Sequence, residues 1–400
     1  MKVLYFHQHF STPKGSIGTR SYQFSQKLID RGHTVKMICG SYWIADTGLS
    51  NNFINGKRSG LVDGINVLEF ELNYSNKDNF FKRTLTFLKY SWQGIKIALK
   101  EDYDVLFATS TPLTAGIPGI FAKLIKHKPF VFEVRDLWPE LPKAMGVINN
   151  SFVLKLMDWL ENISYRFANL CIGLSPGIVN GIKKKNPDKN VILIPNGCHL
   201  NLEKNTIKNK DKDEFICVFT GAHGIANGLD ALLDCAKILI EKGRKDIVIE
   251  FIGDGMLKPK LKERAVNENL NNCKFLDPIP KKILFNYLNN NVSVGLMILD
   301  NIPEFYYGTS PNKFFDYLSL GLPIINNYPG WISDIIKAEN CGIAVEPDNP
   351  TALANSLIKL KDNIKLRNQM SVNSYGIAKN KFDIDKIAED FVGAMESVIA

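Results

Sequence analysis

The chain has 400 residues, more than one hydrophobic core usually supports, so we expect about two domains. Hydrophobic residues make up 45% of it, which excludes a disordered protein. The formal net charge of +8 favours anionic partners. Because the lysines are scattered and no nucleic-acid-binding module is recognisable, we expect no nucleic acid and favour nucleotides or membrane phosphates as partners.

The seven cysteines are far apart, odd in number and set in apolar segments without a C-x-x-C pair. This pattern predicts reduced, buried thiols and a cytoplasmic protein. No apolar run reaches the roughly 18 residues of a membrane-spanning helix, and the run at 1–6 is too short for a signal peptide. His7 and His9 have no acidic third ligand nearby, so we expect no metal site.

Short β-rich segments alternate with helical patterns along the chain, which predicts parallel sheets covered by helices. The first series of predicted strands comprises 2–6, 35–39, 65–70, 105–108, 130–134, 170–174 and 191–194. The second comprises 215–220, 247–252, 292–298, 323–326 and 343–345. The polar segment 203–214 is the predicted linker, so the fold class is α/β with two Rossmann-like domains facing each other across a cleft. The last segment, 384–399, has its apolar residues on one helical face.

After the first strand comes a loop with Gly15 and Gly18. Glycines allow backbone N–H groups to approach a phosphate closely at a helix N-terminus. A plain strand-to-helix turn explains them equally well. A dinucleotide site would add a third glycine and an acid after the second strand, where this chain has Cys39, Gly40 and Ser41. The pattern therefore argues against NAD.

The segment 79–100 predicts an amphipathic helix. We expect its core face to carry Phe81, Leu85, Leu88, Trp92, Ile95 and Leu99. The other side mixes aromatic rings with cations, as membrane-surface helices do, and carries Phe80, Lys82, Arg83, Phe87 and Lys89. The sequence therefore predicts contact with a membrane through this second side.

A dense group of ionisable residues follows the predicted strand 130–134 and includes Glu133, Arg135 and Asp136. Open α/β sheets bind their ligands at the carboxyl ends of strands, so these residues are candidate catalytic groups. A structural ion pair of Arg135 with Asp136 or Glu133 is the alternative.

In the second half, Gly221 and His223 follow the first strand of the second series, and Gly253 and Gly255 follow the next one. Such loops let a nucleotide approach the backbone, although tight turns and an ordinary loop histidine explain the same residues. The segment 194–197 is likewise a turn signal and contains Asn196.

The segment 310–323 predicts a helix start. Pro311 suits the first turn of a helix, and Ser310 is the predicted N-cap. Partial positive charge at this end, with Lys313 beside it, favours an anion such as a diphosphate. Asp316 would then bind a pair of hydroxyls, as a sugar-nucleotide site requires.

This segment resembles the donor-binding helix of the family 4 retaining glycosyltransferases of the GT-B fold. In that family an acidic residue five positions before a Gly-x-Pro turn holds the nucleotide ribose, and here it is Asp316 before Gly321. The segments 133–140, 194–197 and 219–230 are also similar to the family. The chain departs from it at three charged positions, where it has Gly308, Ala222 and Asn227.

The resemblance implies an N-terminal acceptor-side domain at 1–200, a nucleotide-sugar-binding domain at 201–380 and a last helix at 381–400 that packs back on the first domain. It assigns Lys313, Gly15 and Gly18 to the donor phosphates, Asp316 to the ribose, and Arg135 with Asp136 and Glu133 to the sugar or acceptor. It also implies donor contacts from Asn196, Gly221, His223, Gly253, Gly255, Ser310 and Asn312. No cofactor or metal is expected besides the UDP-sugar donor.

The version of the motif at 133–139 resembles a branch that includes bacterial O-antigen and capsule transferases for L-fucosamine. This resemblance implies transfer of an N-acetylated aminodeoxyhexose from UDP to a lipid-diphosphate-linked saccharide at the inner face of the plasma membrane. Two other functions stay open: a nucleotide-sugar 2-epimerase of the same fold, and a non-catalytic sugar-nucleotide-binding subunit.

Overall fold

The computed structural model describes residues 1–74, 78, 80–200 and 214–399, without the side chain of Phe80. The chain forms two compact units. The N-terminal unit comprises Met1–Pro195, Gly308–Ser310 and Asp385–Ala400, and the C-terminal unit comprises Asn196–Tyr307 and Pro311–Ile384. The predicted linker, except for Glu214, lies outside the described residues.

The N-terminal unit is built on a sheet in the order β3-β4-β2-β1-β5-β6-β7-β8. Its strands are β1 (Lys2–Phe6), β2 (Thr34–Tyr42), β3 (Lys57–Val62), β4 (Ile65–Tyr74), β5 (Val105–Thr109), β6 (Phe130–Val134), β7 (Leu170–Gly173) and β8 (Val191–Leu193). All neighbours are parallel except β3, which pairs antiparallel with β4. Sequence reasoning missed β3, because this edge strand is mostly exposed and lacks an apolar run.

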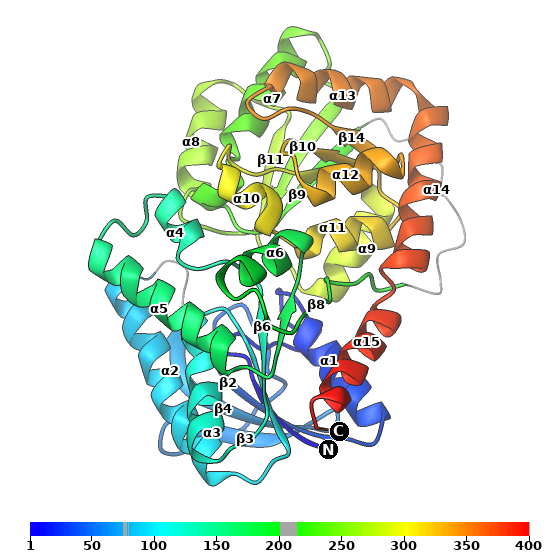
Figure 1. Ribbon diagram of the computed structural model, residues 1–400. Coiled ribbons are helices and arrows are strands. Elements are labelled where there is room, and N and C mark those ends of the chain that lie inside the picture. The colour runs from blue at the N-terminus through cyan, green and yellow to red at the C-terminus, as the bar shows by residue number, and fades with distance from the viewer. Residues whose placement is uncertain (75–77, 79, 201–213, 400) are drawn as a thin grey trace. The chain divides into compact units, whose positions relative to one another are not determined.

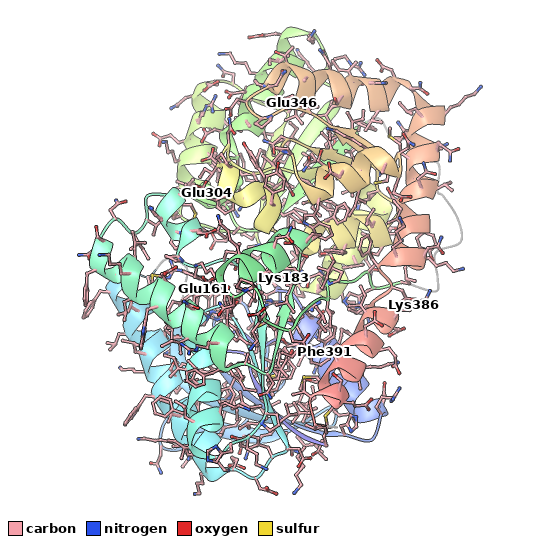
Figure 2. All side chains as sticks on the ribbon, in the orientation of Figure 1. Glu161, Lys183, Glu304, Glu346, Lys386 and Phe391 are labelled. Atoms are coloured by element: carbon pink, nitrogen blue, oxygen red, sulfur yellow. The ribbon has the colours of Figure 1, made fainter. Side chains whose placement is uncertain are left out.

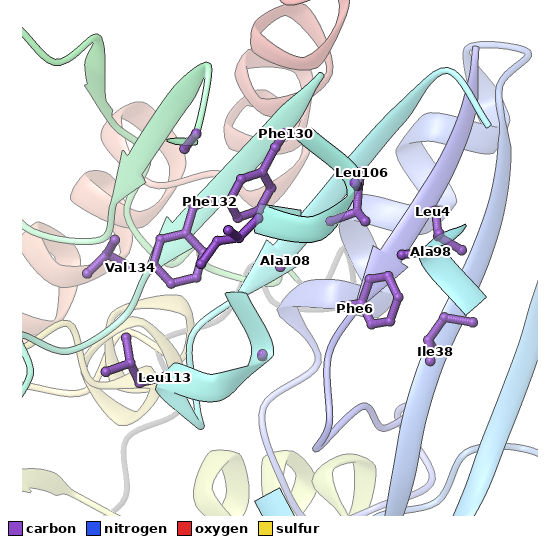
Figure 3. Close-up of a cluster of buried hydrophobic side chains, with 14 of the residues drawn as sticks. Leu4, Phe6, Ile38, Ala98, Leu106, Ala108, Leu113, Phe130, Phe132 and Val134 are labelled. Atoms are coloured by element: carbon purple, nitrogen blue, oxygen red, sulfur yellow. The ribbon is translucent and has the colours of Figure 1, made fainter. Parts of the chain in front are cut away.

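Helices cover both faces of this sheet (Figure 1). They are α1 (Arg20–Asp30), α2 (Phe80–Lys100), η1 (Leu113–Gly116), α3 (Ile117–Ile125), α4 (Glu140–Ala144), α5 (Ser151–Phe167), α6 (Pro176–Lys185) and α15 (Ile384–Ser397). Helix α3 packs between α2 and α5 on one face, and α1 and α15 lie on the other. Between the sheet and the α2–α3–α5 layer lies a core that includes Leu4, Phe6, Leu106, Phe130 and Phe132 (Figure 3).

The predicted core face of α2 is wrong at four of its six residues, whereas Ile95 and Leu99 are half-buried. Phe81 and Trp92 are 78% and 61% exposed, and Leu85 and Leu88 are exposed as well. The helix instead buries Thr86, Tyr90, Ser91, Gly94 and Ala98. At Gly94 the packing is close, because a Cβ there would lie 2.7 Å from the Pro118 side chain. The predicted membrane side is also wrong in part, since Arg83 and Phe87 lie on the half-buried side. The side chain of Phe80 lies outside the described residues.

The last helix, α15, contacts the N-terminal unit through both rings and charges. The ring of Phe391 (Figure 2) stacks on Phe24 of α1, with centroids 4.3 Å apart. His33 Nε2 lies 2.8 Å from a carboxylate oxygen of Glu396, and Arg31 pairs with Glu389. These contacts join the chain's first helix to its last one.

The C-terminal unit has a fully parallel sheet in the order β11-β10-β9-β12-β13-β14. Its strands are β9 (Phe215–Thr220), β10 (Ile247–Ile252), β11 (Cys273–Leu276), β12 (Val294–Met297), β13 (Ile324–Asn326) and β14 (Gly342–Ala344). Sequence reasoning missed β11, a short edge strand that is only half-buried. The helices are η2 (Ile225–Asn227), α7 (Asp230–Glu241), α8 (Lys258–Asn267), α9 (Lys281–Asn291), α10 (Pro303–Gly308), α11 (Asn312–Ser319), α12 (Trp331–Ala338), α13 (Pro350–Asp362) and α14 (Ile364–Lys381).

Two expectations from the sequence, one about the cysteines and one about membrane-spanning helices, can be compared with the structure. All seven cysteines are free, and all but the half-buried Cys273 are buried. Among the described residues, no helix is long and apolar enough to cross a membrane.

Candidate functional site

The first candidate site lies in the C-terminal unit, at the start of α11. The ammonium of Lys313 lies 3.5 Å from the ring centroid of Phe219 on β9 and 3.5 Å from Oδ1 of Asn227. In the described part of the chain, no carboxylate forms an ion pair with it. Burial lowers the pKa of Lys313 well below its usual value, since a desolvated ammonium is costly without a counter-charge. The site is therefore suited to an anion.

The start of α11 differs from the prediction by one position. The helix begins at Asn312, and Pro311 itself occupies the N-cap with φ −74° and ψ 131°. Within the described ranges no side chain caps this end by a hydrogen bond, and the N-cap predicted at Ser310 is not observed. The proline ring restricts φ to about −65°, which suits this position directly before the first helical residue. Asn312 is exposed in the first turn.

Asp316, one turn into α11, is 7% exposed and paired. Its Oδ2 lies 2.5 Å from the ammonium of Lys281 on α9. The next residue, Tyr317, donates its hydroxyl to the carbonyl of Val218 at 3.1 Å and accepts the N–H of Thr220 at 3.0 Å. These bonds fix α11 against β9, so Lys313 and Asp316 are held on a rigid support.

His223 does not supply charge to this site. It is fully buried near Phe219, Phe251 and Phe275, with ring centroids 6.2 to 6.4 Å away. Burial, assisted by Lys258 and Lys313, lowers the pKa of His223 to about 4, so the ring is neutral at pH 7. Neither ring nitrogen has a hydrogen-bond partner among the described residues. The neutral ring of His223 can donate a hydrogen bond to a ligand but supplies no positive charge.

The glycines beside His223 are explained by close backbone packing. Gly253 has φ +151°, and a Cβ there would lie 1.8 Å from the carbonyl oxygen of Gly221. A Cβ on Gly255 would lie 2.4 Å from the carbonyl oxygen of His223. Lys258, which sequence reasoning missed, holds this loop by donating to the carbonyl of Gly253 at 2.8 Å. The glycines therefore let the loops after β9 and β10 touch, whatever ligand they also bind.

The second candidate site lies at the carboxyl end of β6 in the N-terminal unit. Glu133 is fully buried and accepts hydrogen bonds from Arg20 Nε at 2.9 Å and Thr109 Oγ1 at 2.7 Å. Arg135 Nε lies 3.7 Å from Glu133 Oε1, which matches the structural ion pair left open above. Because protein donors occupy both oxygens of Glu133, its geometry is that of a positioning residue.

Arg20 is the residue of this site that sequence reasoning missed. Its buried guanidinium also donates to the carbonyl of Ile194 at 2.8 Å and to that of Pro195, and lies over the ring of Phe24. It thus ties the start of α1 to β6 and to the turn after β8. Its position two residues after Gly18 is the signal that could have identified it.

Arg135 and Asp136 are half-buried, and Arg135 lies near His7 and His9. Burial raises the pKa of Asp136, and the charge of Arg135 partly offsets the effect. Burial and nearby arginines lower the pKa of His9 to about 3 and that of His7 well below its usual value. Arg135 therefore lies close to two neutral histidine rings.

The Gly15 loop packs against residues 44–46. A Cβ on Gly15 would lie 2.8 Å from the Asp46 amide nitrogen, and Thr12 N donates to the carbonyl of Asp46 at 2.7 Å. Gly18 lies two residues before α1. Asn196, a buried residue, belongs to the C-terminal unit. The phosphate roles of Gly15 and Gly18, and the donor roles of Asn196 and Ser310, stay predictions.

Two family models match the chain, one in each half. The model of the glycosyl transferase 4-like domain matches residues 15–197, and that of the glycosyl transferases group 1 matches residues 202–376. The capsular polysaccharide biosynthesis glycosyltransferase CapM of Staphylococcus aureus is 25% identical over 295 residues, which cover 69% of this chain and 72% of CapM.

Solved structures show the same fold. Sucrose-phosphate synthase from Thermosynechococcus elongatus aligns over 99% of this chain and 98% of its own, with a TM-score of 0.76 and 14% identity. Anabaena HepE in complex with UDP-glucose aligns over 99% of this chain and 100% of its own, with a TM-score of 0.69 and 17% identity. Together with the two family models, each of which matches one half of the chain, these alignments show that the chain has the two-domain α/β fold of the GT-B glycosyltransferases.

Proposed function

We propose that this glycosyltransferase moves a sugar from a UDP-sugar to a lipid-linked saccharide in surface polysaccharide biosynthesis, with retention at the anomeric carbon. The observation that carries the proposal is Lys313, a desolvated cation without a carboxylate partner in the described part of the chain, at the start of α11. A diphosphate would supply the missing counter-charge. The relatives support this reading, because CapM is named for capsular polysaccharide and HepE is described with UDP-glucose.

In this proposal the nucleotide binds along α11. Lys313 would contact the diphosphate, and Asp316, one turn later, would accept hydrogen bonds from the ribose hydroxyls. As the bond to the sugar breaks, negative charge grows on the leaving diphosphate, and the fixed ammonium of Lys313 stabilises it without reorganisation. Neutral His223 would donate a hydrogen bond rather than charge. The proposal includes no metal ion.

The sugar and the acceptor are assigned to the other candidate site. Arg135 and Asp136 would contact the transferred sugar or the attacking hydroxyl, while Glu133 and Arg20 position them. The N-acetylated aminodeoxyhexose, with N-acetylfucosamine as the narrowest choice, rests on the resemblance of the motif at 133–139. An O-antigen or capsule saccharide on a lipid diphosphate is the matching acceptor class.

The proposed location is the inner face of the plasma membrane, through an exposed apolar surface on α2, α3 and α5. This surface, which we name the apolar surface, consists of Phe81, Leu85, Leu88, Trp92, Leu124, Ile125, Phe152, Leu156 and Trp159. Helix α2 carries four lysines, one arginine and no carboxylate, and the ammonium of Lys96 lies 5.1 Å from the Trp92 ring. An apolar strip with a cationic border fits an anionic lipid surface.

One product analysis tests the proposed reaction. Purified protein is incubated with UDP-N-acetylated sugars and a lipid-linked N-acetylglucosamine acceptor, with and without EDTA, and the products are identified by mass spectrometry. We expect an extended lipid-linked saccharide in both conditions. An epimerised UDP-sugar without transfer would identify a 2-epimerase, and nucleotide binding without any product would identify a non-catalytic subunit.

A further inference from the structure

A cavity of about 310 Å³ opens in the N-terminal unit, at the carboxyl ends of β2 and β4. Its walls are formed by Ser41, Tyr42, Trp43, Ala45, Asp46, Thr47, Leu49, Phe53, Arg58, Glu69, Asn73 and Tyr74. None of the site residues predicted from the sequence lies in this set. The volume is that of a small-molecule site, which typically begins at about 300 Å³. We name it the β2–β4 cavity.

The lining combines flat aromatic rings with polar groups. Tyr42, Trp43, Phe53 and Tyr74 supply the rings, and Trp43 is 57% exposed. Asn73 adds an amide that can donate and accept hydrogen bonds. A pyranose ring has the complementary chemistry, because it presents apolar C–H groups on its faces and hydroxyls around its edge. A purely hydrocarbon ligand would cover the exposed Asn73 amide without offering it a hydrogen bond.

The polar side of the cavity is fixed before any ligand arrives. Buried Glu69 accepts hydrogen bonds from Thr47 Oγ1 at 2.6 Å, Ser41 Oγ at 3.0 Å and Arg58 Nε at 2.8 Å. The Arg58 guanidinium also lies 4.5 Å from the ring centroid of Phe53. Such a network holds the side chains in place, which lowers the entropic cost of binding.

The charge of the lining distinguishes between ligand classes. The lining contains two carboxylates, Asp46 and Glu69, and one guanidinium, Arg58. Its formal net charge is therefore −1. A nucleotide or a diphosphate would be repelled, whereas a neutral or N-acetylated sugar would not. This sets the cavity apart from the cationic surroundings of Lys313.

The cavity adjoins the second candidate site. His9 lies behind its wall, with its ring 4.5 Å from that of Tyr74 and 5.2 Å from that of Tyr42. Arg135 is close enough to His9 to contribute to the lowering of its pKa. On the other side, the Gly15 loop is bonded to the cavity's own loop, since Ser16 N donates to the carbonyl of Ile44 at 3.0 Å.

We propose that the β2–β4 cavity is a saccharide-binding site that holds a neutral sugar unit of the acceptor, with Trp43 as the stacking ring and Asn73 as a hydroxyl partner. This proposal rests on the proposed function and names a place for its acceptor. Trp43 and Asn73 would be acceptor-binding residues, because they contact a sugar unit beside the reacting group.

The test measures saccharide binding and UDP binding separately. Saturation-transfer NMR with N-acetylglucosamine, chitobiose and glucuronic acid reports on the cavity, and calorimetry with UDP reports on the C-terminal unit. The variants are Trp43→Ala and Asn73→Ala. Trp159→Ala is a matched control, because Trp159 is also 57% exposed in the same unit but lies outside the cavity.

We expect the neutral sugars to bind wild-type protein and the Trp159→Ala control equally, and Trp43→Ala to weaken this binding about tenfold with UDP affinity unchanged. Wild-type protein that binds none of the sugars, or that prefers glucuronic acid, would overturn the proposal, as would unchanged sugar binding in Trp43→Ala. UDP binding without sugar binding would refute the cavity alone. Sugar binding without UDP binding would refute the proposed function and leave the cavity as a saccharide site.

Discussion

The ammonium of Lys281 on α9 lies 2.5 Å from Oδ2 of Asp316 on α11, and both side chains are largely buried. The ammonium of Lys281 supplies a counter-charge to Asp316 in a position where an unpaired charge would be costly. In the described part of the chain no other hydrogen bond reaches this carboxylate. Its second oxygen therefore remains available for a ribose hydroxyl.

Replacing Asp316 by alanine should lower the affinity for UDP at least tenfold. Each charge-assisted bond between a carboxylate and a hydroxyl is worth about 1.5–3 kcal/mol. Isothermal titration calorimetry measures the change, and Glu304→Ala, on α10, is the control with an acid outside the proposed contacts. Unchanged UDP affinity in folded Asp316→Ala protein would remove Asp316 from the donor site.

Replacing Lys281 by alanine should destabilise the C-terminal unit and also weaken UDP binding, because it leaves Asp316 buried without a counter-charge. Breaking a buried pair by removing one partner typically costs about 3–5 kcal/mol. Thermal unfolding measures the stability, and Lys281→Arg should restore much of both properties. A Lys281→Ala protein with wild-type stability and wild-type UDP affinity would contradict the importance of the pair.

Replacing Lys313 by alanine should reduce turnover more than it reduces uridine affinity. Uridine lacks the diphosphate, and the charge on the leaving group is greatest in the transition state. Steady-state kinetics and calorimetry with uridine separate the two effects. An equal loss of affinity for uridine and UDP would indicate a collapsed helix start instead.

The lowered pKa of Lys313 also predicts proton uptake when a UDP-sugar binds. Burial favours the neutral amine, whereas the diphosphate favours the ammonium, so binding raises the pKa and draws a proton from the buffer. Affinity should accordingly fall as the pH rises through the pKa of Lys313. Calorimetry in two buffers of different ionisation enthalpy, with UDP-glucose, measures the protons taken up. If wild-type protein and Lys313→Ala take up the same number of protons, the proton uptake does not come from Lys313.

Replacing Leu85, Leu88 and Trp92 together by serine should release the protein from anionic vesicles. These exposed side chains would lose their insertion into lipid, while the nearby lysines would still add about 1 kcal/mol each at low salt. Co-sedimentation with phosphatidylglycerol vesicles measures binding. The control is Val266→Ser with Ile283→Ser, two exposed apolar residues of the C-terminal unit. Wild-type protein that stays in the supernatant would end the membrane proposal, and a dimer in light scattering would assign the surface to a second copy of the chain.

The sequence alone determined the features that depend on neighbours along the chain. Alternating β-rich and helical patterns located twelve of the strands to within a few residues, because buried parallel strands must be continuous apolar runs. The motif around Asp316 and Gly321 indicated the GT-B fold, since its residues lie within one helix and its turn. The helix start at Asn312 was missed by only one position.

Only the tertiary structure decided which partners distant side chains find. Periodicity showed that α2 is amphipathic but not which side is buried, because Gly94 and its neighbours allow a close contact that outweighs the larger apolar side chains opposite. The pairing of Lys281 with Asp316 and of Arg20 with Glu133 joins residues far apart in the chain. The β2–β4 cavity likewise exists only because the sheet brings Trp43, Arg58 and Tyr74 together. The sequence determines which side chains are available for such contacts, and the packing of helices and strands determines which of them meet.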